Sequence, residues 1–374
     1  MAETQPFKNY YGVELAKTLA AQIQIAYPQF AGQAFIDQVA RAVEPLELKD
    51  RVALIATALR EWLPQDYEQS IDILLSILGP EIPAEAGMFN HGYQLMPVAY
   101  FVEVYGQDHF ELSLKALYEI TKRHTAEFAL RPFLVRYPEE TLRRLDQWTQ
   151  DPNPHVRRLV SEGSRPRLPW ASRLTAFIDD PSPVLALLAR LRSDPSRYVQ
   201  KSVANNLNDI AKDHPQLVLD TLRHWSDEAD GATRWITRHA LRSLVKQGHP
   251  EALDLLGFVE PQVKLSDLRL EPASLGLNDT LLLSFTLTSD SDEPQELMID
   301  YIIHFVRPKG KYREKVFKLS QKTLPAGQSL QVQKRHPFRA VSVRRYYPGR
   351  HRVEIQVNGQ ILGKGYFELT VDPK

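Results

Sequence analysis

The chain has 374 residues, of which 43% are hydrophobic and 25% are charged, and this is ordinary usage for a globular protein of about two or three domains. It contains no cysteine, which excludes disulfides, thiolate metal sites and cysteine nucleophiles. Its 46 basic and 46 acidic residues cancel, and a net charge of zero, taken for the whole chain, argues against a nucleic-acid partner.

The N-terminal segment is acidic and helical in pattern. It begins MAETQPFKNYYG, without the basic and then apolar pattern of a secretion signal, and no apolar run in the chain approaches about 18 residues. We therefore expect a cytoplasmic protein without a membrane span. Residues 1–130 hold 9 basic and 17 acidic residues, and apolar residues recur at helical spacing, as in Val52, Ile55 and Leu59. We predict a helical scaffold here, in which the irregular 87–105 stretch cannot be assigned.

A repeated pattern follows. Asp151-Pro-Asn-Pro-His-Val-Arg-Arg-Leu-Val resembles Asp194-Pro-Ser-Arg-Tyr-Val-Gln-Lys-Ser-Val, and a third copy runs Thr-Arg-Trp-Ile-Thr-Arg-His-Ala. Alignment of Val156, Val199 and Ile236 gives periods of 43 and 37 residues, within the range of HEAT repeats. Each Asp-Pro is expected to end one helix and start the next, because proline suits the first helical turn. The pattern predicts a solenoid of stacked helix pairs.

Basic residues fall in register across the three copies. They are Arg158, Lys201 and Arg238, and residues 131–202 as a whole carry 13 basic and 8 acidic residues. A stripe of cations along one face of a solenoid suits a phosphate backbone. The alternative is structural, since an arginine at such a position can pair with an aspartate of the neighbouring repeat. The periodicity alone does not decide between the two.

The periodicity changes from helical to alternating near residue 260. We predict seven strands, at 263–270, 280–288, 296–306, 315–319, 329–334, 350–357 and 361–371. Asn358-Gly359 between the last two is the dipeptide preferred in a two-residue hairpin turn. Seven short strands in about 110 residues suit an immunoglobulin-like sandwich. The fold class is therefore mostly α, with a HEAT-like solenoid over residues 1–260 and a small all-β immunoglobulin-like sandwich over 261–374.

Four stretches of the helical part carry a family resemblance. They are Thr125-Ala-Glu-Phe-Ala-Leu-Arg-Pro-Phe, Val156-Arg-Arg-Leu-Val-Ser-Glu-Gly-Ser-Arg-Pro-Arg-Leu-Pro-Trp, Ser202-Val-Ala-Asn-Asn-Leu-Asn-Asp-Ile-Ala-Lys-Asp-His-Pro and Thr233-Arg-Trp-Ile-Thr-Arg-His-Ala. Over roughly residues 5–258 the chain resembles the AlkC branch of the HEAT-like alkylpurine DNA glycosylases, some of which carry an immunoglobulin-like domain.

The resemblance implies an activity. The family excises cationic N-alkylated bases, chiefly 3-methyladenine and 3-methylcytosine, from duplex DNA and leaves an abasic site. It is monofunctional and needs no metal or other cofactor. It is thought to act from the minor groove on a lesion left in the base stack. The sequence agrees with this, because no segment suggests a deep pocket for an extruded base.

The resemblance places catalytic carboxylates at Glu127 and Glu162. An alkylated cationic base leaves without a general acid, so the enzyme has to stabilise the oxocarbenium-like sugar and orient a water, and carboxylates do both. The structural alternative for Glu162 is an i,i+4 surface ion pair with Arg158, and for Glu127 a capping or solvated acid. Trp170 is expected to stack on the lesion or hold its charge by a cation–π contact, the alternative being a packing anchor at a repeat boundary.

The same stretches supply cations for the phosphates that flank the lesion. These are Arg131, Arg158, Arg165 and Arg167, in addition to Lys201 and Arg238 of the repeat register. Arg165 and Arg167 lie on either side of a proline, so we expect them to point in opposite directions and only one of them to contact DNA.

A second basic cluster lies in the predicted sandwich. Residues 307–352 hold 14 basic residues and one acidic residue. We expect this cluster to clamp DNA, and the alternative is a solvated sheet face that protects an edge. The members that we single out are Arg307, Lys309, Lys311, Arg313, Lys315, Arg344, Arg345 and Arg350.

No further motif points to another chemistry. The sequence has no His-x-x-x-His pair and no glycine-rich nucleotide motif, so we expect neither a metal nor a nucleotide cofactor. The expected partner is double-stranded DNA that contains alkylated bases, and the expected state is a monomer. Two rival interpretations stay open: a non-catalytic HEAT-repeat adaptor for DNA or protein, and a DNA-binding relative that has lost catalysis.

Overall fold

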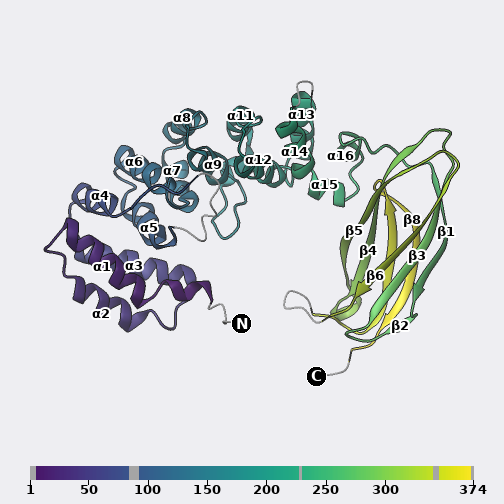
Figure 1. Cartoon of the computed structure of the whole chain (residues 1–374), viewed down its shortest axis with the longest axis horizontal. Coiled ribbons are helices and arrows are strands. Elements are labelled where there is room, and N and C mark those ends of the chain that lie inside the picture. Colours follow the sequence, from purple (N-terminus) through teal and green to yellow (C-terminus); the bar gives the residue numbers. More distant parts are fainter. Residues whose placement is uncertain (1–5, 84–91, 227–229, 340–344, 372–374) are drawn as a thin grey trace. The chain divides into compact units, whose positions relative to one another are not determined.

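The structure is a computed structural model that describes residues 6–83, 92–226, 230–339 and 345–371. The chain divides into two compact units (Figure 1). The first unit is helical and comprises Met1–His214 with Trp225–Ala240. The second unit comprises Pro215–His224 with Leu241–Lys374 and contains all the strands.

The helical unit consists of short helices joined by tight turns. Its helices are η1 (Phe7–Tyr10), α1 (Val13–Ala26), α2 (Gly32–Ala42), α3 (Leu48–Trp62), α4 (Tyr67–Ser76), η2 (Tyr93–Leu95), α5 (Met96–Tyr105), α6 (Phe110–Thr121), α7 (Glu127–Arg136), α8 (Pro138–Trp148), α9 (Pro154–Gly163), α10 (Thr175–Asp179), α11 (Ser182–Arg190), α12 (Arg197–Ile210) and α14 (Gly231–Ala240). Within the described residues, no helix combines the length and the apolar character that a membrane span requires.

These helices stack in two rows, as the solenoid prediction requires. In one row, which we call the inner row, α3, α5, α7, α9, α12 and α14 pack in sequence, each on the next. The helices α4, α6, α8 and α11 form the other row (Figure 1). The inner row is the one that carries the repeat register, since α9, α12 and α14 contain its three copies.

The repeat alignment is confirmed by burial. Val156 and Val199 are each the third residue of their helices, α9 and α12, whereas Ile236 lies one turn further into α14, and all three are fully buried. The pairing of arginine with a neighbouring aspartate also exists, but it uses Arg157: its guanidinium donates to both carboxylate oxygens of Asp194 at 2.6 and 3.0 Å. Arg158, the member of the repeat register that follows Arg157, is therefore not needed for this contact between neighbouring repeats.

The second unit is a two-sheet sandwich preceded by helices. These are α13 (Pro215–Ser226, of which residues 225–226 belong to the first unit), α15 (Arg242–Lys246) and α16 (Pro250–Asp254), and a 3-10 helix, η3 (Pro308–Gly310), lies within the sandwich. The strands are β1 (Val263–Glu271), β2 (Ser274–Leu275), β3 (Thr280–Ser289), β4 (Gln295–Val306), β5 (Tyr312–Leu324), β6 (Ser329–Pro337), β7 (Gly349–Val357) and β8 (Gln360–Leu369). The sheet orders are β1-β3-β6 and β2-β8-β7-β4-β5.

All seven predicted strands are present, with two differences. The short β2 was not predicted, and it pairs in parallel with β8 at the sheet edge. The fourth predicted strand is longer than expected, since β5 has 13 residues and pairs along the whole length of β4. Alternation on β7 is confirmed, because Val353, Ile355 and Val357 all lie in the core between the sheets.

The predicted hairpin turn is confirmed and also anchors the sandwich. Asn358 and Gly359 both have positive φ, 42° and 84°, as a two-residue turn of this kind requires. The Asn358 amide accepts a hydrogen bond from Met298 N at 2.7 Å and donates to the carbonyls of Val259 at 2.8 Å and Glu296 at 3.0 Å. One buried side chain thus ties the hairpin to β4 and to the segment that enters the sandwich.

We predict that Asn358→Ala lowers the free energy of unfolding of the second unit by about 3 kcal/mol, because it removes three hydrogen bonds and puts alanine at a positive φ. Asn358→Gly keeps the turn and loses only the hydrogen bonds, so it should cost about 2 kcal/mol. Urea unfolding followed by circular dichroism measures both. Equal stability of the alanine variant and the wild type would contradict this account of the hairpin.

Candidate functional site

The two predicted carboxylates meet because of how α7 and α9 pack. Glu127 is the first residue of α7, and Glu162 lies at the end of α9, the next helix of the inner row. α9 starts at a proline after an asparagine cap, and it ends at Gly163. A Cβ at Gly163 would come 2.5 Å from a methyl carbon of Leu130, so glycine permits the close approach of the two helices.

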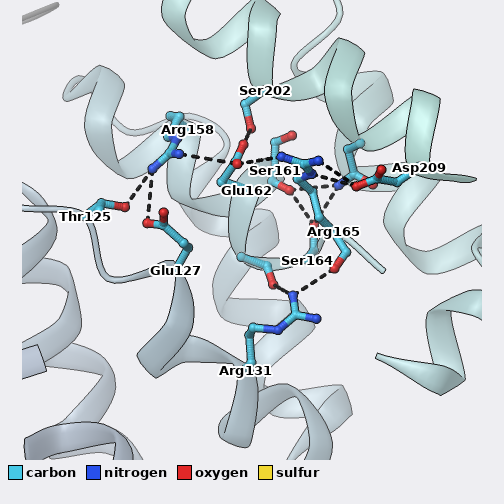
Figure 2. A network of polar contacts seen from close by, with 12 residues as sticks. Thr125, Glu127, Arg131, Arg158, Ser161, Glu162, Ser164, Arg165, Ser202 and Asp209 are labelled. Atoms are coloured by element: carbon cyan, nitrogen blue, oxygen red, sulfur yellow. Dashed lines mark hydrogen bonds and ion pairs between the residues drawn. The ribbon is translucent and has the colours of Figure 1, made fainter. Parts of the chain in front are cut away.

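Arg158 joins the two carboxylates (Figure 2). Its Nη1 donates to Glu127 Oε2 at 3.2 Å and to Thr125 Oγ1 at 2.7 Å, and its Nη2 lies 3.5 Å from Glu162 Oε1. The guanidinium also lies 5.3 Å from the ring centre of Tyr198, whose pKa burial raises to about 12. Both carboxylates are 7% exposed. The i,i+4 pair of Arg158 and Glu162 therefore exists, but it is buried and shared with a second acid.

Glu162 has further partners on both oxygens. Arg165 Nη1 donates to Oε1 at 2.7 Å, and the Ser202 hydroxyl, from α12, donates to Oε2 at 2.6 Å. Burial would raise the pKa of Glu162, but the charges of Arg158 and Arg165 and the Ser202 hydroxyl outweigh it and hold the pKa below its usual range. Glu162 is therefore ionised at neutral pH, the state in which it stabilises positive charge.

Burial would lower the pKa of Arg158, but the charges of Glu127 and Glu162 outweigh it and raise the pKa. Arg158 is thus always charged. A charged guanidinium between two buried carboxylates offsets the cost of placing them close together away from water.

Two arginines expected to bind phosphates instead support the site from within (Figure 2). Arg131 is 3% exposed and donates to the carbonyls of Gly163 at 3.0 Å, Arg165 at 2.8 Å and Ser172 at 2.6 Å. Arg165 is 7% exposed and pairs with Asp209 at 2.8 Å. Guanidinium groups enclosed in this way are out of reach of a DNA backbone, so a phosphate contact fits neither residue.

The other expected cations of the helical unit are more accessible. Arg167 is partly exposed and binds both oxygens of Asp213, at 2.7 and 2.8 Å. Arg165 and Arg167 differ in exposure. They pair with Asp209 and Asp213, which are four residues apart, so that the two arginines point in opposite directions stays a prediction. Lys201 and Arg238 are exposed on α12 and α14. The stripe of three register cations is therefore reduced to two, because Arg158 is buried with its carboxylates.

Trp170 lies in the loop between α9 and α10 and is exposed, so it is not a packing anchor. Its side chain is 74% exposed, and its backbone has a positive φ of 66°, which is uncommon for a residue with a side chain. Lys49 of α3 donates a hydrogen bond to its carbonyl. An exposed indole held by an unusual backbone conformation is more typical of ligand contact than of packing.

A pocket of about 820 Å³ lies beside the carboxylates. Glu127, Glu162, Arg158 and Trp170 line it, and its other walls come from η1, α3, α5 and α7. Nothing in the sequence indicated this pocket, since no segment suggests a deep pocket for an extruded base. A pocket between stacked helices leaves no continuous sequence signal, because its lining comes from η1, α3, α5, α7 and α9 and from the loop after α9, which are separated along the chain.

The N-terminal segment therefore contributes to the site and is not only a scaffold. α5 forms in the stretch that the sequence left unassigned, and it supplies Tyr100 and Glu103 to the pocket, opposite Lys49 of α3. Burial raises the pKa of Glu103, and the charge of Lys49 opposes this shift. α5 was missed because it is apolar on nearly all sides, so its pattern has no helical period.

The basic cluster of the sandwich lies at one end of β4 and β5. Lys309, Lys311 and Arg313 are exposed, and Arg307 is half-buried. Arg307 and Arg345 both lie over the ring of Tyr347, at 5.7 and 5.6 Å from its centre. Arg344 lies outside the described residues.

Among the described residues, no three His, Asp or Glu side chains are arranged to hold a metal ion.

Comparison with known proteins identifies both parts of the chain. The family model for DNA alkylation repair enzymes matches residues 119–244, and that for the C-terminal Ig-like domain of the uncharacterised protein YhaZ matches residues 264–371. YhaZ of Bacillus subtilis (strain 168) is 37% identical over 364 residues, which are 97% of this chain and 99% of that protein.

A solved structure is similar over nearly the whole length. It is that of the Pseudomonas fluorescens alkylpurine DNA glycosylase AlkC bound to DNA containing an abasic site analog, with a TM-score of 0.91 and 39% identity over 98% of this chain and 100% of that one. The chain therefore belongs to the AlkC-type family of DNA alkylation repair enzymes, with a HEAT-like helical unit and a C-terminal immunoglobulin-like domain.

Proposed function

We propose that the chain is a monofunctional DNA glycosylase that hydrolyses the N-glycosidic bond of cationic alkylated bases, such as 3-methyladenine and 3-methylcytosine, in duplex DNA. The observation that carries the proposal is the pair of buried carboxylates, Glu127 and Glu162, that Arg158 holds together beside a pocket and an exposed tryptophan. An adaptor protein does not need such a pair, because burying charged groups costs free energy and perturbed buried charges cluster at functional sites.

The two carboxylates have different roles. Glu162 already accepts hydrogen bonds or ion pairs on both oxygens, so it serves as a fixed negative charge toward the oxocarbenium-like sugar. Glu127 contacts Arg158 through Oε2, and its Oε1 has no partner among the described residues. That oxygen is the acceptor that orients the attacking water. The leaving base is already positively charged and needs no proton.

Trp170 stacks on the lesion or holds its charge by a cation–π contact. Its exposure places the indole at the surface and not at the bottom of the pocket, and this supports approach to a lesion that stays in the base stack. Arg167, Lys201 and Arg238 bind phosphates of the duplex, and the exposed cations of the sandwich close on the DNA as a clamp.

We predict that Glu127→Gln and Glu162→Gln each lower the single-turnover rate of 3-methyladenine release by about 10²- to 10³-fold, because each removes a charge that the transition state uses. The affinity of each variant for undamaged duplex DNA, measured alongside its excision rate, shows whether the variant is folded. Glu139→Gln, an exposed glutamate on α8, is the matched control and should excise at the wild-type rate. No release by the wild type would support the non-catalytic adaptor.

The rate of 3-methyladenine release should be level from about pH 8 to pH 5 and fall only near or below about pH 4. The reason is the lowered pKa of Glu162: a carboxylate acting as an anion stays active above its pKa, and a lowered pKa extends the active range toward acid. Spontaneous base loss is subtracted with an enzyme-free sample at each pH. A rate that rises on acidification between about pH 7 and 5 would instead point to a protonated carboxyl as general acid.

The clamp has a salt-dependence test. We predict that replacing Lys309, Lys311 and Arg313 together by glutamine weakens binding to duplex DNA and flattens the plot of log K against log salt, by about 0.9 for each phosphate that the variant no longer neutralises. The matched control replaces three exposed cations elsewhere on the sandwich, namely Lys264, Arg269 and Lys364. An unchanged slope in the first variant would show that this cluster does not touch phosphates.

A further inference from the structure

One face of α12 is polar although it is buried. Ser202, Asn206 and Asp209 follow one another at intervals of four and three residues, so they share one side of the helix, and all three are buried. We call them the polar face of α12. In the repeat alignment Ser202 corresponds to Leu159 of α9, a buried apolar residue. A buried polar side chain costs free energy unless it is hydrogen-bonded, so this face requires partners.

The polar face contacts the end of α9, the segment that contains Glu162. The Ser202 hydroxyl donates to Glu162 Oε2 at 2.6 Å (Figure 2). The Asn206 amide donates at 2.8 Å to the carbonyl of the residue before Glu162. Asp209 accepts a hydrogen bond from Arg165 Nε at 2.8 Å, and Arg165 in turn donates to Glu162 Oε1. A helix of the next repeat thus holds Glu162, the adjacent backbone and one of its arginine partners.

Ser202 is the member of the polar face that contacts Glu162 directly. Oε1 of Glu162 interacts with Arg158 and Arg165. In the part of the chain that the structure describes, the Ser202 hydroxyl is the only hydrogen-bond donor to Oε2. The last torsion of a glutamate side chain has broad energy minima, so contacts on one oxygen alone leave the carboxylate able to turn. The contact on the second oxygen fixes its plane.

We propose that the polar face of α12 positions the Glu162 carboxylate for the reaction, and that Ser202 is the positioning residue on which its orientation depends. The proposal rests on the proposed function, because it takes Glu162 as a charge that the transition state uses. Ser202 is buried, so it acts through Glu162 and not by touching DNA. A carboxylate that is already fixed needs no reorganisation when positive charge develops on the sugar.

The test removes two buried hydroxyls, one at a time, next to the same glutamate. Ser202→Ala removes the hydroxyl that contacts Glu162, and Ser202→Thr keeps a hydroxyl there. Ser161→Ala is the matched control, because the Ser161 hydroxyl on α9 is also buried but has no hydrogen-bond partner among the described residues. Alanine is the best helix former, so both alanine variants retain their helices. Single-turnover release of 3-methyladenine is measured against protein concentration and against pH.

We expect Ser202→Ala to lower the maximal rate by about tenfold, the contribution of one hydrogen bond to a charged group. The half-saturating protein concentration should not change. On acidification, the rate of this variant should fall at a higher pH than that of the wild type, because the Ser202 hydroxyl helps to lower the pKa of Glu162. Ser202→Thr should keep the pH profile of the wild type, and Ser161→Ala should keep its rate as well.

A role in packing alone would give a different result. An unchanged maximal rate or an unchanged pH profile in Ser202→Ala overturns the proposal, and so does a Ser202→Thr variant with the pH profile of Ser202→Ala. The other charged groups around Glu162 are the same in every variant, so a shift between variants reports the hydroxyl. They are Arg158, Arg165, Glu127 and Asp209.

A measurement without DNA separates this proposal from the proposed function. In protein labelled for NMR at the glutamate carboxyl carbons, the resonance that is absent from Glu162→Gln belongs to Glu162. Its titration should move to higher pH in Ser202→Ala and stay in place in Ser161→Ala. If the wild type releases 3-methyladenine but this titration does not move, the glycosylase proposal stands and the positioning role is wrong. If the wild type releases no base, the proposed function fails, and a titration that moves still shows that Ser202 holds the Glu162 charge.

Discussion

The site depends on one guanidinium between two buried carboxylates. Without Arg158, the buried carboxylates of Glu127 and Glu162 would have no positive charge between them. When Arg158 is present, burial of the carboxylates strengthens their attraction to a cationic sugar, because the local dielectric constant is low. Arg131 and Arg165 extend the same logic outward, since both are buried and hold the backbone and side chains around Glu162 in place.

The repeat architecture makes this arrangement possible. Neighbouring arginines on α9 do different work: Arg157 joins its repeat to the next through Asp194, and Arg158 turns toward α7. A helix rotates by about 100° per residue, so adjacent side chains face different neighbours. Arg157 thus contributes to the packing of the repeats, while Arg158 remains available to contact the carboxylates of the site. Gly163 completes the arrangement by letting the end of α9 approach α7 closely.

Much of the fold followed from periodicity, because helices and strands place their buried residues at fixed intervals. The change of period near residue 260, the register of Val156, Val199 and Ile236, and the turn at Asn358-Gly359 all correspond to observed features. The failures have a common origin. α5 is apolar on almost every side and shows no period, and β2 is only two residues long. Where the pattern is absent or too short, the local sequence carries no signal for the element.

By itself, the sequence determined which residues carry charge, where the repeats lie and, through a long specific motif, which acids and which tryptophan are of interest. It also showed that a net charge of zero conceals an acidic N-terminal segment and two basic regions. Only the tertiary structure decided what each charge does. Arg131 and Arg165 are buried, whereas Arg167 is partly exposed. Lys49 of α3 and Glu103 of α5 line the same pocket as Glu127 of α7. These outcomes depend on helix packing, which brings together side chains that are far apart in the chain and that no local pattern connects.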